Sequence, residues 1–216
     1  MKRFFFILSI MILLSVSAFS QTSKSIQLNT GLLIPMSSTE GIAASVQYNH
    51  PLNNTFEFYI YTGFSFWDKR NLSILEEFSE IQKQTRFNAY SEDNHIIVPV
   101  FLGAKSNIYH GNKTTTFILF EAGYSYLNYN TYKIDKNVNE ETGEVLSYET
   151  NRNSKEEVTE NLFGIGAGLG LSYELNDSFN IIITYKIISQ LNSDYYDFLS
   201  NSATYSSFNL GFGFSL

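Results

Sequence analysis

The sequence predicts an all-β fold: an eight-stranded antiparallel up-and-down transmembrane β-barrel, preceded by a cleaved signal peptide. Three observations predict the barrel. Bulky apolar residues alternate with small or polar ones in eight segments, only 16% of the 216 residues are charged, and the connections between segments alternate between short and long.

Residues 1–20 have the pattern of a secretory signal peptide. Lys2 and Arg3 precede an apolar run over residues 4–14, and small residues, among them Ala18 and Ser20, follow it. The run is shorter than the roughly 20 residues that a membrane-spanning helix needs, so an anchor helix is the less favoured alternative. We therefore expect cleavage before Gln21, export across the inner membrane, and one barrel domain over residues 21–216.

The predicted strands are the eight alternating segments. The last one is the clearest, because Phe208, Leu210 and Phe212 point one way while Asn209 and Gly211 point the other. The segments cover about residues 25–35, 41–50, 55–68, 94–109, 114–129, 160–175, 179–190 and 204–216.

The bulky face of each strand is predicted to face lipid. Eight such faces would overfill the narrow lumen of an eight-stranded barrel, whereas the opposite face, rich in Gly and Ser, suits a tight interior. The segments are long enough for this assignment, because about 9–11 tilted residues cross the hydrocarbon layer. A soluble ligand-binding barrel with the two faces reversed is the alternative.

The connections favour one orientation in the membrane. Short turns are expected near residues 50–54, 110–113 and 176–178, and long loops over 70–93, 130–159 and 191–203. Short periplasmic turns and long outer loops are typical of outer-membrane barrels.

The long loops are acidic: residues 130–160 hold eight acidic and four basic side chains, a net charge of −4. This predicts either a solvated, mobile surface or a binding surface for a divalent cation or an extracellular protein partner. An apolar pattern in the first long loop predicts a short amphipathic helix with Leu72, Ile74, Leu75, Phe78 and Ile81.

The chain resembles a known group of proteins. Its signal peptide, its eight alternating segments and its terminal strand (Asn-Leu-Gly-Phe-Gly-Phe-Ser-Leu, residues 209–216) are similar to small outer-membrane β-barrels of the OmpX and OmpA-transmembrane type. More narrowly, Ile-Ile-Val-Pro-Val-Phe-Leu-Gly-Ala-Lys over residues 96–105 resembles the Ile-Pro strand of the PorT-like outer-membrane barrel family of Bacteroidetes.

The resemblance implies a place in the Gram-negative outer membrane, with a structural or secretion-accessory role. It also implies that outer-membrane lipid and the barrel-insertion machinery are partners, the latter reading a signal in the terminal strand formed by Phe212, Phe214 and Leu216. The last residue of such barrels is usually aromatic, and here it is Leu216.

Four charged residues on the lumen face predict an internal charge network: Glu57, Lys105, Glu121 and Lys186. A lone charge in a packed lumen is costly, whereas a paired and hydrogen-bonded one is tolerated. A proton or ion path is the functional alternative.

No catalytic residue, cofactor or metal is expected, and the protein is predicted to be a non-enzymatic monomer with a closed lumen. The absence of Cys removes thiol catalysis, and a net charge of −7 disfavours nucleic-acid binding. The glycines over residues 164–170 lack dinucleotide-loop spacing. His95 is expected to be a solvated histidine at the outer rim with no Ser following it at close spacing, and Pro99 predicts a β-bulge or a local kink. A narrow porin-like channel and a lipid-modifying enzyme remain as alternatives.

Overall fold

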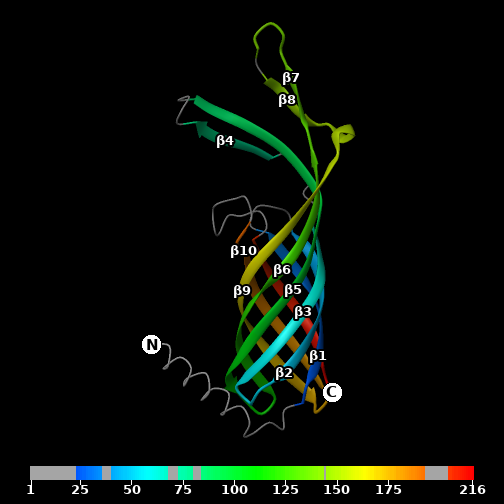
Figure 1. Ribbon diagram of the computed structural model, residues 1–216, viewed down its shortest axis with the longest axis vertical. Helices are drawn as coiled ribbons and strands as arrows, with labels where there is room; N and C mark the ends of the chain where they lie inside the picture. Colours follow the sequence, from blue (N-terminus) through cyan, green and yellow to red (C-terminus); the bar gives the residue numbers. More distant parts are fainter. Residues whose placement is uncertain (1–22, 36–39, 68–72, 80–83, 144, 193–203) are drawn as a thin grey trace.

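The computed structural model is a closed β-barrel with β-ribbons extending from one end (Figure 1). It describes residues 23–35, 40–67, 73–79, 84–143, 145–192 and 204–216, with the backbone alone described for 73–79 and 84–90. The expected cleavage site before Gln21 and most of the expected loop over 191–203 lie outside the described residues. Among the described residues, no helix is long and apolar enough to cross a membrane.

Eight antiparallel strands form the barrel wall, and β3 pairs with β5 to close it. Neighbours in the wall follow one another along the chain, apart from the additional strands outside the barrel, so the predicted up-and-down topology is confirmed. The wall strands are β1 (Ser25–Pro35), β2 (Gly41–Pro51), β3 (Phe56–Trp67), β5 (Gln84–His110), β6 (Thr114–Tyr132), β9 (Glu156–Asn176), β10 (Phe179–Gln190) and β11 (Tyr205–Ser215).

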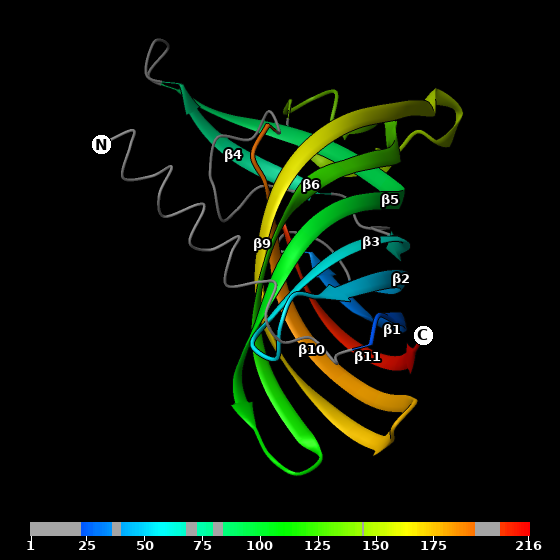
Figure 2. The same cartoon turned by 60° about the horizontal axis from the view of Figure 1, so that its bottom comes forward.

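The alternation in the sequence sets which side chains face outward. On β11, Phe208, Leu210 and Phe212 are 49%, 41% and 48% exposed on the outer wall, while Gly211 is buried. Because successive side chains of a strand point to opposite faces, this pattern places the bulky face outside and the small face in the lumen. The predicted assignment of faces is confirmed. Figure 2 shows the tilted strands around this interior from the end where the short turns lie.

Beyond the barrel, β5, β6 and β9 continue together as a small sheet, which we call the blade: residues 91–94 of β5, 128–132 of β6 and 156–163 of β9. β4 (Ser73–Ser79) pairs with the far end of β5, and β7 (Ile134–Val138) pairs with β8 (Val145–Thr150), giving two ribbons that diverge in Figure 1. A short 3-10 turn, η1 (Arg152–Ser154), leads back to the blade. The predicted amphipathic helix is wrong, because its central part is β4, whose backbone groups pair with β5 instead.

The register of β5 changes at its exit from the barrel and not at Pro99. A register shift lies between Asp93 and Ile96, where Asn94 adopts a φ of 53°, a conformation that Asn tolerates better than most residues. Pro99 keeps its register against β6, so of the two predicted alternatives the bulge is wrong. Its missing N–H coincides instead with a break in the β3–β5 ladder between Val100 and Ile97.

Candidate functional site

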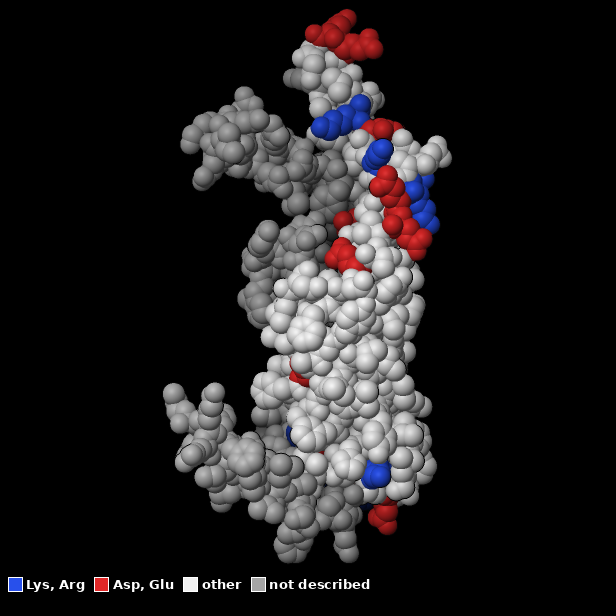
Figure 3. Space-filling view, viewed as in Figure 1, with Lys and Arg blue, Asp and Glu red and all other residues white. Residues whose placement is uncertain are grey.

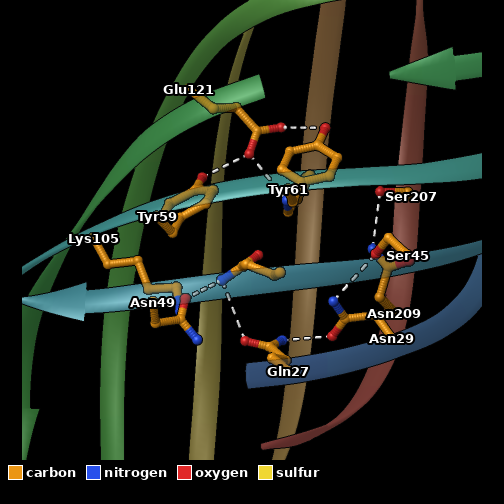
Figure 4. Close-up of polar contacts among 12 residues, drawn as sticks. Gln27, Asn29, Ser45, Asn49, Tyr59, Tyr61, Lys105, Glu121, Ser207 and Asn209 are labelled. Carbon is orange, nitrogen blue, oxygen red and sulfur yellow. Dashed lines mark hydrogen bonds and ion pairs between the residues drawn. The ribbon is translucent and has the colours of Figure 1, made fainter. Parts of the chain in front are cut away.

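A buried carboxylate lies at the centre of the lumen. Glu121 on β6, whose side chain is 0% exposed, accepts hydrogen bonds from the hydroxyls of Tyr59 (2.6 Å) and Tyr61 (3.0 Å). The Nζ of Lys186 on β10 lies 2.9 Å from Oε2 of Glu121 and 4.1 Å from the centre of the Tyr61 ring. Figure 4 shows both tyrosines pointing at the carboxylate from β3. Two hydroxyl donors and one cation therefore compensate the cost of burying this charge in a low dielectric.

Glycines on β9 make room for this contact. Glu121 pairs with Gly166, and Lys186 pairs with Gly168, so the two charged side chains meet across β9, the strand between their own. A Cβ on Gly166 would come within 2.7 Å of Cγ of Glu121, and one on Gly168 within 3.2 Å of Cγ of Lys186. The glycines of β9 therefore leave room for the two charged side chains to meet, and they do not form a phosphate-binding loop.

A second ion pair lies nearer the short turns. Lys105 on β5 faces Glu57 in the β3–β5 register, with Nζ 2.7 Å from Oε1 of Glu57 and 3.0 Å from Oδ1 of Asn49. From Asn49 a chain of side-chain amides continues through Gln47 to Gln27. Figure 4 shows this chain crossing β2 and β1.

The four charged residues of the predicted network all lie in the lumen, as two pairs and not as one cluster. The structure brings Glu57 to Lys105 and Glu121 to Lys186. Tyr59 and Tyr61 were not predicted to belong to the network, although their alternation with Phe58 and Ile60 places them on the lumen face. The contribution of these pairs to stability stays a prediction.

The outer half of the lumen mixes large apolar side chains with buried polar ones. Phe101 and Ile97 on β5 and Leu33 on β1 are 0% exposed, and so are Ser125 on β6 and Thr204. Polar groups therefore face the lumen in this half as well, while large apolar side chains fill much of the space without needing hydrogen-bond partners.

Little space remains near the Glu121–Lys186 pair. Two voids of about 20 and 30 Å³ lie beside Lys186, room for a water molecule or two. Neither could pass a solute.

An aromatic stack lies at the outer end of the lumen. The ring of His95 lies between Trp67, 4.9 Å away, and Tyr129, 5.0 Å away, and it is tilted by 12° or less from the plane of each. His95 is only 6% exposed and its Nε2 is 3.3 Å from Oε2 of Glu92, so the expectation of a solvated histidine is wrong. Stacking between two larger rings hides the imidazole from water.

An ion pair between Asp93 and Arg152 links the blade to the turn η1. Oδ2 of Asp93 lies 2.5 Å from Nη1 of Arg152, while Oδ1 accepts hydrogen bonds from Asn130 (3.1 Å) and Tyr132 (3.0 Å). Burial alone would raise the pKa of Asp93, but the hydrogen bonds from Asn130, Arg152 and Tyr132 outweigh it and lower that pKa below its ordinary value. The carboxylate thus holds together the loop after β8 and the base of the blade.

One edge of the blade is unpaired. β9 pairs with β6 from Glu156 onward but with β10 only from Gly164 onward, so in the described structure residues 156–163 have a strand partner on one side only. Asn192 closes the lowest part of this edge, because its side chain accepts from the N–H of Phe163 (2.6 Å) and donates to the C=O of Asn161 (2.8 Å). Since backbone groups alternate in direction along a strand, the N–H and C=O of Thr159 and Glu157 point to the same open side.

The predicted insertion signal is the end of β11. Phe212 and Leu216 are 48% and 68% exposed on the outside, and the ring of Phe214 packs edge-on against Phe179 at 5.2 Å. Its role as a signal stays a prediction. In the described part of the chain, no three His, Cys, Asp or Glu side chains are grouped as metal ligands.

No protein-family model and no curated protein sequence matches the chain. The structure is similar to Neisserial surface protein A, with 10% identity, a TM-score of 0.53, and coverage of 90% of this chain and 98% of that chain. It is also similar to a major outer membrane protein from Thermus thermophilus, with 12% identity, a TM-score of 0.53, and coverage of 90% and 100%. The chain therefore has the fold of the small outer-membrane β-barrels. The narrower resemblance to the PorT-like family stays a prediction.

Proposed function

We propose that the protein is an integral outer-membrane barrel with a closed lumen, whose blade binds an extended segment of another protein at the cell surface. The unpaired edge of β9 carries the second part of this proposal. A strand edge with free N–H and C=O groups pairs with an added strand, which gains main-chain hydrogen bonds.

The outer wall supports a membrane location. Large apolar side chains, each at least 40% exposed, surround the barrel, whereas soluble monomers rarely expose contiguous apolar patches beyond a few hundred Å². Figure 3 shows one face of the barrel wall, which is largely free of charged side chains; these gather at the blade, at the β7–β8 ribbon and near the short turns. The apolar residues include Leu28, Ile42, Phe64, Leu102, Phe120 and Leu169.

The remaining assignments complete the same proposal. Residues 1–20 direct export, the barrel-insertion machinery reads the end of β11, and the monomer is oriented with its short turns in the periplasm. The ribbons and the blade then lie outside the cell, where a partner can reach the open edge.

The charge of the edge indicates the kind of partner. Glu156, Glu157 and Glu160 lie along the unpaired segment, and Asn128 donates a 2.7 Å hydrogen bond to Oε1 of Glu157. An added strand with basic side chains complements these carboxylates, whereas like charges placed opposite one another destabilise a strand pair.

The test uses the folded barrel in lipid nanodiscs and a nine-residue peptide of alternating Thr and Lys. We expect the peptide to slow hydrogen exchange at the amides of Glu157 and Thr159, and the same peptide with Glu in place of Lys to have no effect. Thr159→Pro removes the outward N–H without breaking the β6 ladder, so it should weaken binding about tenfold.

Thr159→Val is the matched control, because it keeps the backbone donor and changes only the side chain. The proposal of strand addition fails if Thr159→Pro binds the peptide as well as Thr159→Val does. It also fails if protection appears at barrel amides instead of at the edge.

A further inference from the structure

We infer that the lumen mouth at the short turns is a binding site for an N-acetylated sugar. A cavity of about 380 Å³, which we call the vestibule, opens there and lies in the range of small-molecule sites, about 300–1,000 Å³. Its lining includes Ser25, Asn49, Lys105, Asn107, Thr115 and Ser172. None of these residues belongs to the blade, so the vestibule is a separate site at the opposite end of the barrel.

The lining favours a neutral ligand rich in hydrogen-bonding groups. Eleven of the twenty lining residues are Ser, Thr or Asn, side chains that both donate and accept hydrogen bonds. Lys105 and Glu57 lie 2.7 Å apart and compensate each other, while the exposed Glu174 and Asp177 add two carboxylates to the lining. A ligand with hydroxyl and amide groups can donate to these carboxylates and matches such walls better than an anion does.

The inner end of the vestibule has a small apolar floor. Phe117 and Ile182 are both 4% exposed and line the cavity beside Lys105, whose Nζ lies 5.3 Å from the centre of the Phe117 ring. Since so little of these side chains is accessible, the polar walls supply most of the contacts to a sugar. An N-acetyl group adds one amide donor and one acceptor for the Asn side chains.

The vestibule is blocked at its inner end and is not the entrance of a path. Lys105 lines both the vestibule and the void of about 20 Å³ above it, so its side chain separates the two spaces. A ligand that enters from the short-turn end is therefore held there. In the proposed orientation this end faces the periplasm, where the glycan strands of the cell wall carry N-acetylated sugars; that source rests on the proposed function, whereas binding itself does not.

The experiment titrates the folded barrel in nanodiscs with N,N′-diacetylchitobiose and follows side-chain amide signals by NMR. We expect saturable shifts at Asn49 and Asn107, with a millimolar-range dissociation constant. Trp67, the single Trp of the chain, lies at the opposite end of the lumen, so its indole signal should stay unmoved.

Two variants test the site, and a third is the control. Ser172→Phe places a ring in the vestibule and should abolish the shifts, while Thr115→Val removes one hydroxyl and should weaken binding about fivefold. Ser147→Phe on the outer ribbon, a matched substitution, should bind like the native protein. A change of gel mobility on heating in detergent verifies that each variant is folded.

Three results would overturn the assignment: no saturable shift at about 10 mM sugar, unchanged binding by Ser172→Phe, or equal shifts on addition of trialanine, which would make the pocket a peptide site. Because this readout uses vestibule amides and the strand-addition test uses amides of the blade, either proposal can fail alone.

Discussion

Glu121 and Glu57 differ in how much of each side chain is exposed to water. This difference sets how strongly the folded protein depends on the lysine that pairs with each carboxylate. The side chain of Glu121 is 0% exposed and that of Glu57 is 24% exposed. A buried carboxylate that loses its cation keeps the whole desolvation cost, whereas a partly exposed one regains hydration. The two ion pairs of the lumen are therefore unequal.

Lys186→Met should destabilise the barrel more than Lys105→Met does. We expect a loss of about 3–5 kcal/mol for Lys186→Met, which leaves Glu121 buried and unpaired by a cation, and about 1–2 kcal/mol for Lys105→Met. Urea unfolding in lipid vesicles measures both, with Lys136→Met on the outer ribbon as a control within about 0.5 kcal/mol of native. Equal losses, or a larger loss for Lys105→Met, would contradict this account.

Docking of the turn η1 should weaken in acid. The pKa of Asp93 is lower in the folded protein than in the unfolded chain, so its contribution is fully present above the unfolded pKa and is lost as pH falls through the folded one. We expect proteolysis at Arg152 to accelerate below about pH 4 in the native protein. In Asp93→Asn, cleavage should be fast already at neutral pH and nearly independent of pH, and a native-like acid response in that variant would exclude Asp93 as the cause.

At the scale of elements, the sequence predicts strands where lipid imposes alternation and fails where it does not. The eight wall strands follow from the two-residue period, but β4, β7 and β8 lie outside the barrel, where neither face must be apolar. The apolar residues near Leu75 happen to be spaced as in a helix, but this segment forms the strand β4 because its backbone pairs with β5.

The same limit applies to the lumen. Alternation places Lys105, Glu121 and Lys186 inside, but it cannot pair them, because the Lys186–Glu121 contact crosses β9 and depends on the register at Gly166. It also cannot predict which lumen side chains pack around Phe101 in the outer half.

Protection of the backbone at the barrel end of the open β9 edge should depend on the side-chain amide of Asn192. Asn192→Ala removes the hydrogen bonds of that amide to Phe163 and Asn161, so hydrogen exchange of the Phe163 amide should accelerate about tenfold with little change in global stability. Asn192→Asp keeps the acceptor for Phe163, so protection of that amide should persist. Equal acceleration in both variants would show that Asn192 does not protect the Phe163 amide by accepting its hydrogen bond.

At the scale of the whole molecule, the lumen combines a buried charged layer with an outer layer that holds large apolar side chains. In the proposed closed lumen, the side chains around Phe101 and Ile97 raise the dehydration cost of an ion, and the voids beside Lys186 have room only for water. We expect no steady current in planar lipid bilayers. Heat-unfolded protein in the same detergent controls for leakage, and a stable open-state current from the folded barrel would favour the channel alternative.

The orientation of the barrel can be tested because the chain contains no Cys, so each introduced thiol is the only one. Asn139, in the turn of the β7–β8 ribbon, and Gly111, in the short turn between β5 and β6, lie at opposite ends of the molecule. If the blade faces outward, Asn139→Cys reacts with a membrane-impermeant maleimide on intact cells, whereas Gly111→Cys reacts only after the outer membrane is permeabilised. Thr62→Cys, in the lipid-facing part of β3, should stay unlabelled in both conditions. Labelling of Gly111→Cys on intact cells, with Asn139→Cys protected, would reverse the orientation and place the open edge of β9 in the periplasm.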